Sequence, residues 1–235
     1  MKKLEPLKLK PMKHLAIIMD WNRRWAKQRF LPAIFGHKAG FDTIKIVTDL
    51  AKNKSIEYLT LWWLSTDNLV KRDKEEIDGI IKLIAQVPKL LPDFMKKWLK
   101  LQIIWNIHSL PQESQDILEK CIQETSQNTG IVLTVALVYG GQDEIVRATK
   151  KIIQAGINPD TLNENEFRKY LDTSILPLPD MIVRTGGDIR HSGFLLYDSA
   201  YSEYYFTDKK WPEFDEKELD AVIEAYERSQ RNFWK

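Results

Sequence analysis

The sequence predicts an α/β fold: a single domain with a mainly parallel central sheet flanked by helices. Two observations support this prediction. Short runs rich in Ile, Leu, Val and aromatic residues alternate with longer amphipathic segments, and strands that alternate with helices imply right-handed crossovers and a sheet covered on both faces. A chain of 235 residues, 43% of them hydrophobic, can also bury one full core. No repeat, low-complexity tract or linker divides it.

The individual elements follow from two kinds of apolar spacing. Short runs without a helical period predict strands at residues 14–19, 58–64, 101–105, 131–139 and 181–183. Apolar side chains three or four residues apart predict helices at residues 41–52, 75–91, 112–127, 143–154 and 215–231. Pro88 and Pro92 should end or bend the second helix, because proline lacks the N–H that an inner helical turn needs.

The bulk composition excludes several classes of protein. Lys plus Arg is 35 against 33 for Asp plus Glu, so the net charge of +2 gives no global attraction to nucleic acid or to an anionic membrane. Cys121 is the only cysteine, which excludes a disulfide framework and fits a reducing cytosol. Residues 1–13 form a basic extension ahead of a domain at 14–235. No run approaches the roughly 18 apolar residues of a membrane span, so we expect a soluble, cytoplasmic protein.

Charged side chains gather where the first predicted strand ends. The apolar run reaches Asp20, and Asn22, Arg23 and Arg24 follow at once. A carboxylate can ligate Mg²⁺, an arginine can bind phosphate oxygens in pairs, and the N–H groups of a following helix point at the same place. The same letters also describe a strand, a turn and a solvated basic helix start. This segment alone supports the two interpretations equally.

Residues 183–206 repeat the arrangement at the last predicted strand. Arg184 ends that strand, a pair of glycines follows, and Arg190 and Ser192 come next, with Glu203 expected in an aromatic-rich helix. Two arginines and a hydroxyl can bind phosphate oxygens together, so this segment is a second candidate phosphate-binding site, or clamp, after the one at residues 20–24. The alternative is a surface turn whose arginines pair with nearby acids. Two clamps at two strand ends make that alternative the weaker one, because ligands of parallel sheets bind beyond the carboxyl ends of the strands.

Six blocks of sequence carry a resemblance to a known family. They are HLAIIMD-x-N-x-RWAK from residue 14, FGHKAG at 35–40, LSTDN at 64–68, YGG at 139–141, IVRTGGDIR at 182–190 and YFTDKKWPEFDE at 205–216. Together they resemble the cis-prenyltransferase family, whose best-known member is undecaprenyl diphosphate synthase. The blocks cover nearly the whole chain in the family's order and spacing, which makes the resemblance specific.

The resemblance implies an enzyme that joins an allylic diphosphate, with farnesyl diphosphate expected, to isopentenyl diphosphate units. The expected product is undecaprenyl diphosphate, a cis-polyprenyl lipid that associates with the membrane surface. The resemblance also implies Mg²⁺ as cofactor, a homodimer, no nucleic-acid partner, and an apolar tunnel walled by the helix at 75–91 and the strand at 58–64. Two alternatives stay open: a short-chain or irregular coupling enzyme of the same fold, and a non-catalytic binding or partner subunit. A phosphatase or nucleotide-binding enzyme lacks support, since the chain has no Walker-type loop or acidic cluster.

Residue roles are carried over from the same resemblance. Asp20 is expected to hold Mg²⁺ against the allylic diphosphate. The residues expected around that leaving group are Asn22, Arg24 and His37. Those expected on the isopentenyl diphosphate are Arg184, Arg190 and Ser192, with Glu203 helping to place its metal near the partner subunit. The wider substrate-binding set includes Trp21, Arg23, Trp25, Leu69, Lys71 and Arg72.

Three of these roles compete with plainer interpretations. His37 could be a packed core histidine, although its place in GHKAG at an expected helix start favours anion binding. Ser65 and Asn68 match a pair near the carbon that loses its proton, yet both are ordinary turn formers. Residues 69–76 resemble the family's mobile loop with one extra residue, so either Lys71 or Arg72 is the basic contact. A charged helix start explains the same letters.

The chain departs from the family's usual residues at several positions. The resemblance implies Gly at 21, Arg at 33, Trp at 69, Asn at 138 and Glu at 188, where this sequence has Trp21, Ala33, Leu69, Val138 and Asp188. Loss of the arginine at 33 removes a charge-assisted contact worth about 1.5–3 kcal/mol.

Tryptophan stands at other positions where the resemblance implies glycine or a small residue, namely Trp63, Trp105 and Trp234. The chain has 10 glycines and 8 tryptophans, whereas a usage of about 7% predicts roughly 16 glycines. One hypothesis is that UGA codons meaning glycine in the source organism have been translated as Trp. The other is real divergence, in which Trp63 narrows the tunnel and shortens the product. A genuine Trp21 would impair turnover, because the backbone there must approach the diphosphate closely.

Overall fold

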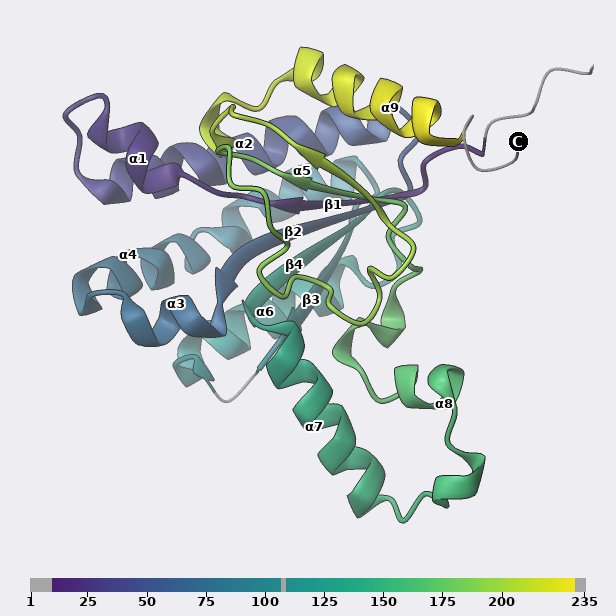
Figure 1. Ribbon diagram of the computed structural model, residues 1–235. Helices are drawn as coiled ribbons and strands as arrows, with labels where there is room; N and C mark the ends of the chain where they lie inside the picture. Colours follow the sequence, from purple (N-terminus) through teal and green to yellow (C-terminus); the bar gives the residue numbers. More distant parts are fainter. Residues whose placement is uncertain (1–9, 107–108, 231–235) are drawn as a thin grey trace, which may run out of the picture.

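The computed structural model describes residues 10–106 and 109–230 and shows one α/β unit built on a parallel sheet (Figure 1). Residues 1–9 of the expected extension, the last residue of the expected C-terminal helix and Trp234 lie outside the described residues. Within the described ranges, no helix has both the length and the apolar character needed to cross a bilayer.

Six strands form the sheet in the order β3-β4-β2-β1-β5-β6, and every neighbouring pair is parallel. They are β1 (His14–Ile18), β2 (Tyr58–Ser65), β3 (Lys100–Trp105), β4 (Val132–Tyr139), β5 (Met181–Arg184) and β6 (Glu203–Phe206). The five expected strands and the α/β class are confirmed. The expected helix at Glu203 is wrong: that residue begins β6, which pairs with β5.

The helices lie between and around these strands. They are α1 (Asn22–Lys27), α2 (Ala33–Asn53), α3 (Thr66–Lys71), α4 (Lys74–Ile84), α5 (Leu91–Lys96), α6 (Gln112–Thr125), α7 (Gly141–Gln154), α8 (Glu164–Arg168) and α9 (Glu216–Gln230). Short 3₁₀ turns cover Val87–Leu90, Pro159–Thr161, Asp172–Ile175 and Trp211–Glu213. The helix expected at 75–91 ends at Ile84, and Pro88 and Pro92 each lie in the first turn of a new short helix.

Helix α2 begins at Ala33 rather than at residue 41, because two glycines let it pack closely on α1. A Cβ at Gly36 would collide with the main-chain oxygen of Asn22, and one at Gly40 would lie 2.5 Å from Asn22 Oδ1. Glycine has low helix propensity, which is why this stretch does not look helical in the sequence. The GHKAG block is therefore inside a helix and serves its packing.

Alternate side chains of β1 join two apolar clusters, one on each face of the sheet. Leu15 and Ile17 belong to a cluster that includes side chains of α2, α4, α6 and α9. Ala16 and Ile18 belong to a second cluster with Phe194. Since both faces are covered, the central strands are continuous apolar runs, as in other parallel sheets.

Two tryptophans lie on left-handed backbone, one at each end of the sheet. Trp21 (φ 73°) follows β1 and precedes α1, and Trp98 (φ 56°) lies between α5 and β3 with 61% of its surface exposed. Around Trp98, the N–H of Leu99 donates to Phe94 O and that of Trp98 to Met95 O. This pattern closes a helix at a residue that is usually glycine. Other side chains cost about 1–2 kcal/mol in this conformation.

Candidate functional site

A pocket of about 730 Å³ lies where the carboxyl ends of β1, β2, β4 and β5 meet. The residues that line it are 18–24, 62–68, 140–143, 190–193, His37, Arg72, Arg184, Asp188 and Leu196. Parallel strands bring their carboxyl ends to one edge of the sheet, and ligands bind there. The two basic segments singled out in the sequence therefore line the same pocket.

The two segments are joined through Arg184. Its guanidinium donates to Asp20 Oδ2 at 2.6 Å, to Ser192 Oγ at 2.8 Å and to the main-chain oxygen of Arg190 at 2.6 Å. Asp188 accepts from Arg184 at 3.3 Å and from the Arg190 side chain at 2.9 Å. Burial alone would raise the pKa of Asp188, but the hydrogen bond and charge of Arg190 hold it below its ordinary value. The Arg184 side chain is buried, so this network fixes its direction.

Asp20 is held at the rim by short main-chain contacts. Its own N–H donates to Thr185 Oγ1 at 2.9 Å, and its Oδ1 accepts from the N–H of Trp21 at 3.0 Å. The carboxylate keeps 34% of its surface exposed. The side chain is thus oriented by β1 and β5 together and still open to the pocket.

A second wall of the pocket is organised by Glu76, a residue of α4. Its carboxylate accepts from His37 Nε2 at 2.9 Å and pairs with Arg72 at 3.0 Å and Arg23 at 3.2 Å. Burial lowers the pKa of His37, with the hydrogen bond to Glu76 acting against it. His37 is in the second turn of α2, so the expectation of a helix start at this residue is wrong. It lines the pocket as a buried, hydrogen-bonded histidine.

Trp21 lines the pocket, and its ring lies beside Arg24 and Gly186. The guanidinium carbon of Arg24 lies 3.7 Å from the centre of the Trp21 ring. A Cβ at Gly186 would collide with the same ring. Both the left-handed backbone and the crowding of position 21 are what a glycine there would relieve.

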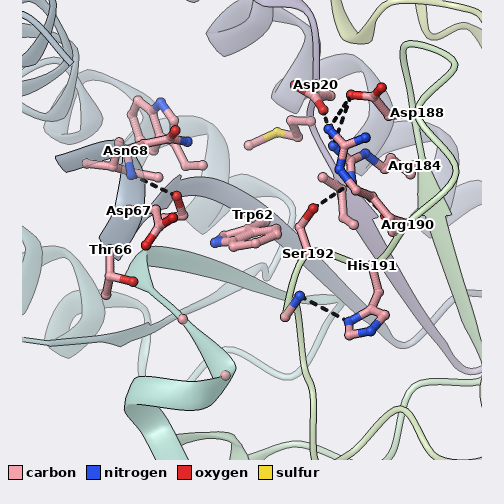
Figure 2. A pocket seen from close by; sticks show the side chains of 18 of the residues that line it. Asp20, Trp62, Thr66, Asp67, Asn68, Arg184, Asp188, Arg190, His191 and Ser192 are labelled. Carbon is pink, nitrogen blue, oxygen red and sulfur yellow. Dashed lines mark hydrogen bonds and ion pairs between the residues drawn. The ribbon is translucent and has the colours of Figure 1, made fainter. Parts of the chain in front are cut away.

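The third wall comes from β2 and the start of α3. Ser65 Oγ accepts from the N–H of Asn68 at 3.0 Å and so caps α3. Figure 2 shows Thr66, Asp67 and Asn68 on one side of the pocket and Asp20, Arg184, Arg190 and Ser192 on the other, with Trp62 between them. Trp62 donates to Tyr139 O at 3.1 Å and stacks on Phe194 with ring centres 5.0 Å apart.

The apolar part of the pocket comes from β1 and β2. Ile18, Met19, Trp63 and Leu64 line it, and Trp63 packs on Phe41 with ring centres 5.6 Å apart. Helix α4, which was expected to wall a tunnel, contributes none of the residues that line this pocket. Its buried side chains belong to the core cluster, and a tunnel walled by α4 stays a prediction.

Comparison with known proteins identifies the family. Residues 18–234 match the family described as "Putative undecaprenyl diphosphate synthase". The chain belongs to this family. The isoprenyl transferase of Oceanobacillus iheyensis is 39% identical over 225 residues, which are 94% of this chain and 89% of that protein. The one of Clostridium tetani is 41% identical over 226 residues, 94% of this chain and 88% of that protein.

A solved structure supports the same assignment for this prenyltransferase. The crystal structure of lavandulyl diphosphate synthase from Lavandula x intermedia, in complex with dimethylallyl diphosphate, superposes with a TM-score of 0.88 at 30% identity. The match covers 92% of this chain and 95% of that one. The fold and the cis-prenyltransferase activity expected from the sequence are therefore confirmed at the level of the family.

Four of the predicted site residues lie away from the pocket of this prenyltransferase. Trp25 lies under Arg29, with the guanidinium carbon 4.2 Å from its ring centre. Leu69 packs on the core. Lys71 pairs with Asp67 at 2.6 Å and points to solvent. Of the two basic candidates, Arg72 is the one that lines the pocket.

Glu203 is the fourth of these residues. It pairs with Met181 at the start of β5, whereas Arg184 at the end of β5 pairs with Phe206. With about 3.3 Å per strand residue, roughly 10 Å of sheet separates Glu203 from the end that holds Asp20. A single chain therefore does not bring the two predicted metal ligands together.

Several lining or supporting residues were not predicted. They are Trp62, Thr185, Asp188, His191, Gln142, Asp143 and Glu76. Thr185 and Asp188 lie inside the VRTGGDIR block, and Glu76 ends the loop block, so their neighbours were visible in the sequence. Their contacts join segments far apart in the sequence, so the sequence did not show them.

The protein side chains in the pocket fit a metal ion whose remaining ligands come from the substrate. Among the described residues, no three His, Cys, Asp or Glu side chains are grouped so as to hold an ion. Asp20 offers one partly exposed carboxylate beside several cationic donors. Mg²⁺ usually takes one or two carboxylates, with phosphate oxygens and water as the other ligands. The pocket fits that mode and not an all-protein cage.

Proposed function

We propose that this protein condenses farnesyl diphosphate with isopentenyl diphosphate units to make undecaprenyl diphosphate, as a Mg²⁺-dependent homodimer in the cytoplasm. One observation carries the proposal: an open carboxylate, Asp20, is oriented by a buried arginine, Arg184, in a pocket that five further cationic or polar groups enter. Those groups are Arg23, Arg24, Arg72 and the pair Arg190–Ser192. Two diphosphates carry enough negative charge to need such a set.

The reaction needs no protein nucleophile. The allylic C–O bond breaks, and the diphosphate leaves with the electron pair. The double bond of isopentenyl diphosphate then attacks the allylic carbon, a C–C bond forms, and the attacking partner loses a proton to restore a double bond. The protein must stabilise the departing charge, align two substrates and exclude water.

The two sides of the pocket divide that work. Arg24 and Arg72, with Asn22, bind the allylic diphosphate beside Asp20. Arg184, Arg190 and Ser192 bind the diphosphate of isopentenyl diphosphate. Ser65 caps α3 with an oxygen lone pair, so its hydroxyl proton stays free to contact a substrate. When bound at Asp20, Mg²⁺ supplies Lewis acidity to the leaving oxygens.

An incorporation assay tests the proposal. The full chain is incubated with farnesyl diphosphate and labelled isopentenyl diphosphate, with Mg²⁺ and then with EDTA. Incorporation that depends on Mg²⁺ and on Asp20 is expected. Metal-independent incorporation, or full activity of Asp20→Ala, would overturn the mechanism. Size-exclusion chromatography with light scattering tests the homodimer, in which a second chain would have to bring Glu203 to the metal.

A short-chain or irregular synthase is the second candidate function. It is favoured by Trp63, which with Trp62 fills the apolar part of the pocket and packs on Phe41. Chromatography of the dephosphorylated lipid separates the candidates. A short product from the chain as printed, and a longer one from Trp63→Ala, would favour the second. An unchanged long product supports the first.

A further inference from the structure

The turn between α1 and α2 exposes large apolar side chains. Phe30 is 97% exposed and Phe35 49%, with Leu31 and Ile34 both exposed at 39%. Phe30 lies on left-handed backbone (φ 55°) with its side chain almost wholly in solvent. Figure 1 shows α1 and this turn projecting from one end of the molecule, in dark purple at the upper left. A projecting cluster of aliphatic and aromatic side chains marks an interaction surface.

The same segment is strongly basic. Between Asp20 and Asp42, residues 21–41 contain five Lys and Arg and no Asp or Glu. The whole chain has a net charge of +2, so the rest of it carries a net −3, the difference between +2 and +5. Arg23 and Arg29 pair with acids of neighbouring segments. Lys27 and Lys38 have no ion-pair partner within the described ranges and are exposed.

We propose that this turn, residues 27–38, docks the protein on an anionic lipid bilayer. Exposed aromatic and aliphatic side chains enter the boundary between headgroups and acyl chains, and flanking cations stay with the anionic headgroups. Each Lys or Arg near such a surface contributes about 1 kcal/mol. Lys27 and Arg29 precede the apolar side chains in this segment and Lys38 follows them, so both kinds of side chain can engage together.

The position of the turn ties this surface to the site. Helix α1 lines the pocket through Asn22, Arg23 and Arg24, and the exposed turn follows it directly. A bilayer bound there would face the rim of the pocket. This step rests on the proposed function, since a long polyprenyl product is soluble in a bilayer and not in water.

Charge favours a bilayer over the other occupants. In a symmetric dimer centred on this turn, the same basic patch would meet itself, and like charges would repel. Nucleic acid would satisfy the cations, but it would leave the aliphatic side chains of Leu31 and Ile34 without an apolar partner.

Vesicle flotation of the full chain tests the proposal. Vesicles of phosphatidylcholine alone are compared with vesicles that also contain phosphatidylglycerol. Binding only to the anionic vesicles, weakened at high salt, is expected. Phe30→Ser with Phe35→Ser should lower the bound fraction about tenfold. Ile153→Ser, on the 73% exposed Ile153 of α7, is the matched control and should not change it.

A second measurement places the turn relative to the lipid. An environment-sensitive dye on Phe30→Cys should shift to the blue with anionic vesicles, and the same dye on Ile153→Cys should not. The native Cys121 is buried and does not compete for the dye. Equal binding to neutral vesicles, equal loss in the Ile153 control, or a change in oligomeric state in place of lipid binding would each overturn the proposal. Turnover in vesicle-free buffer is followed separately, so a failed assay of function leaves this test intact.

Discussion

The two ends of the parallel sheet carry similar polar residues in different settings. At the amino end, the Asp180 carboxylate accepts from the N–H groups of Lys13 and His14 at 2.8 and 3.0 Å and from Lys10 Nζ at 2.9 Å. Its side chain is 10% exposed. At the carboxyl end, Asp20 accepts from one side chain, that of Arg184 at 2.6 Å, and is 34% exposed.

The difference separates structural polar groups from functional ones. A carboxylate whose hydrogen bonds all come from the fold stabilises that fold. A carboxylate that is oriented by the fold and left open to a pocket is available to a ligand. Residue type alone does not distinguish the two, since both are aspartates beside a strand with basic neighbours. Variants at the two ends should therefore change different quantities.

The largest effect is expected from Asp20→Ala. It should lower kcat/KM for isopentenyl incorporation by about 10²–10³-fold, as does loss of one preorganised charge-stabilising group elsewhere. The melting temperature should change much less, because Asp188 still pairs with the buried Arg184 when the Asp20 carboxylate is removed. A kcat/KM within tenfold of that of the parent protein would mean that Asp20 has a structural role, like Asp180. Steady-state kinetics and a thermal melt on the same preparation decide between the two outcomes.

A smaller effect is expected from Arg184→Lys. Lysine keeps the charge but cannot reach Asp20, Ser192 and the Arg190 oxygen together, because it lacks the planar fork. Loss of one or two charged hydrogen bonds, at about 1.5 kcal/mol each, corresponds to roughly a 10- to 100-fold rise in KM for isopentenyl diphosphate. An unchanged KM with a lowered kcat would contradict a binding role.

Trp21 and Trp98, which lie on left-handed backbone at opposite ends of the sheet, allow a second comparison of the two ends. Trp21→Gly should relieve the backbone and clear the pocket, so we expect stability to rise by about 1 kcal/mol and kcat/KM to rise. Trp98→Gly should give the same gain in stability and leave kcat/KM unchanged. Chemical unfolding and kinetics on both variants provide the measurement. A fall in stability for either variant would refute the assignment of a glycine conformation.

The mass of the protein from its source organism tests the codon hypothesis directly. If UGA means glycine there, peptides that span Trp21, Trp63, Trp105 and Trp234 should have masses that fit glycine, and so should a peptide that spans Trp98 on its left-handed backbone. Trp62 and Trp211 should remain tryptophan, because both are buried and their indole N–H groups donate to main-chain oxygens. Masses that fit tryptophan at every one of the positions expected to be glycine would refute the hypothesis.

The smallest effect on turnover is expected at the amino end of the sheet, where titration changes stability. Burial lowers the pKa of His14, so below about pH 6.5 the unfolded chain binds a proton first and stability falls. Burial alone would raise the pKa of Asp180, but hydrogen bonds from Lys10, His14 and Lys13 hold it below its ordinary value. Stability is lost again as pH falls below about 3.9 and through that lowered pKa.

Asp180→Asn isolates the second of these losses. It should cost about 1.5–3 kcal/mol of unfolding free energy at neutral pH and flatten the fall below pH 4. Turnover at moderate temperature should not change. Urea unfolding at a series of pH values measures both quantities. A loss of turnover without a loss of stability would contradict the structural role of this end.

The sequence was sufficient for the parts of the fold with a strong local signal. The central strands are continuous apolar runs, so β1, β2 and β4 were predicted. Asp20 and Arg184 were expected to share an edge, because carboxyl ends of parallel strands do. Strand β6 was missed because EYYF is four residues long and has no clear period.

The rest depends on contacts between distant segments. Nothing near Glu76 in the sequence says that His37 and Arg23 meet it. Nothing near Trp25 says that it turns away from the pocket. The start of α2 was hidden by two glycines whose value lies in the packing against α1. Helix propensity depends on the local sequence, whereas these glycines are explained by a contact between two helices.

The ion pair between Asp20 and Arg184 has a thermodynamic consequence. An anion that takes the donors of Arg184 leaves Asp20 without its partner, and a cation at Asp20 does the same to Arg184. Each ligand therefore removes part of the cost of binding the other. By linkage the two affinities must rise by the same factor. Measured separately, either ligand would look weak; titrated together, they should show positive cooperativity across a single 2.6 Å contact.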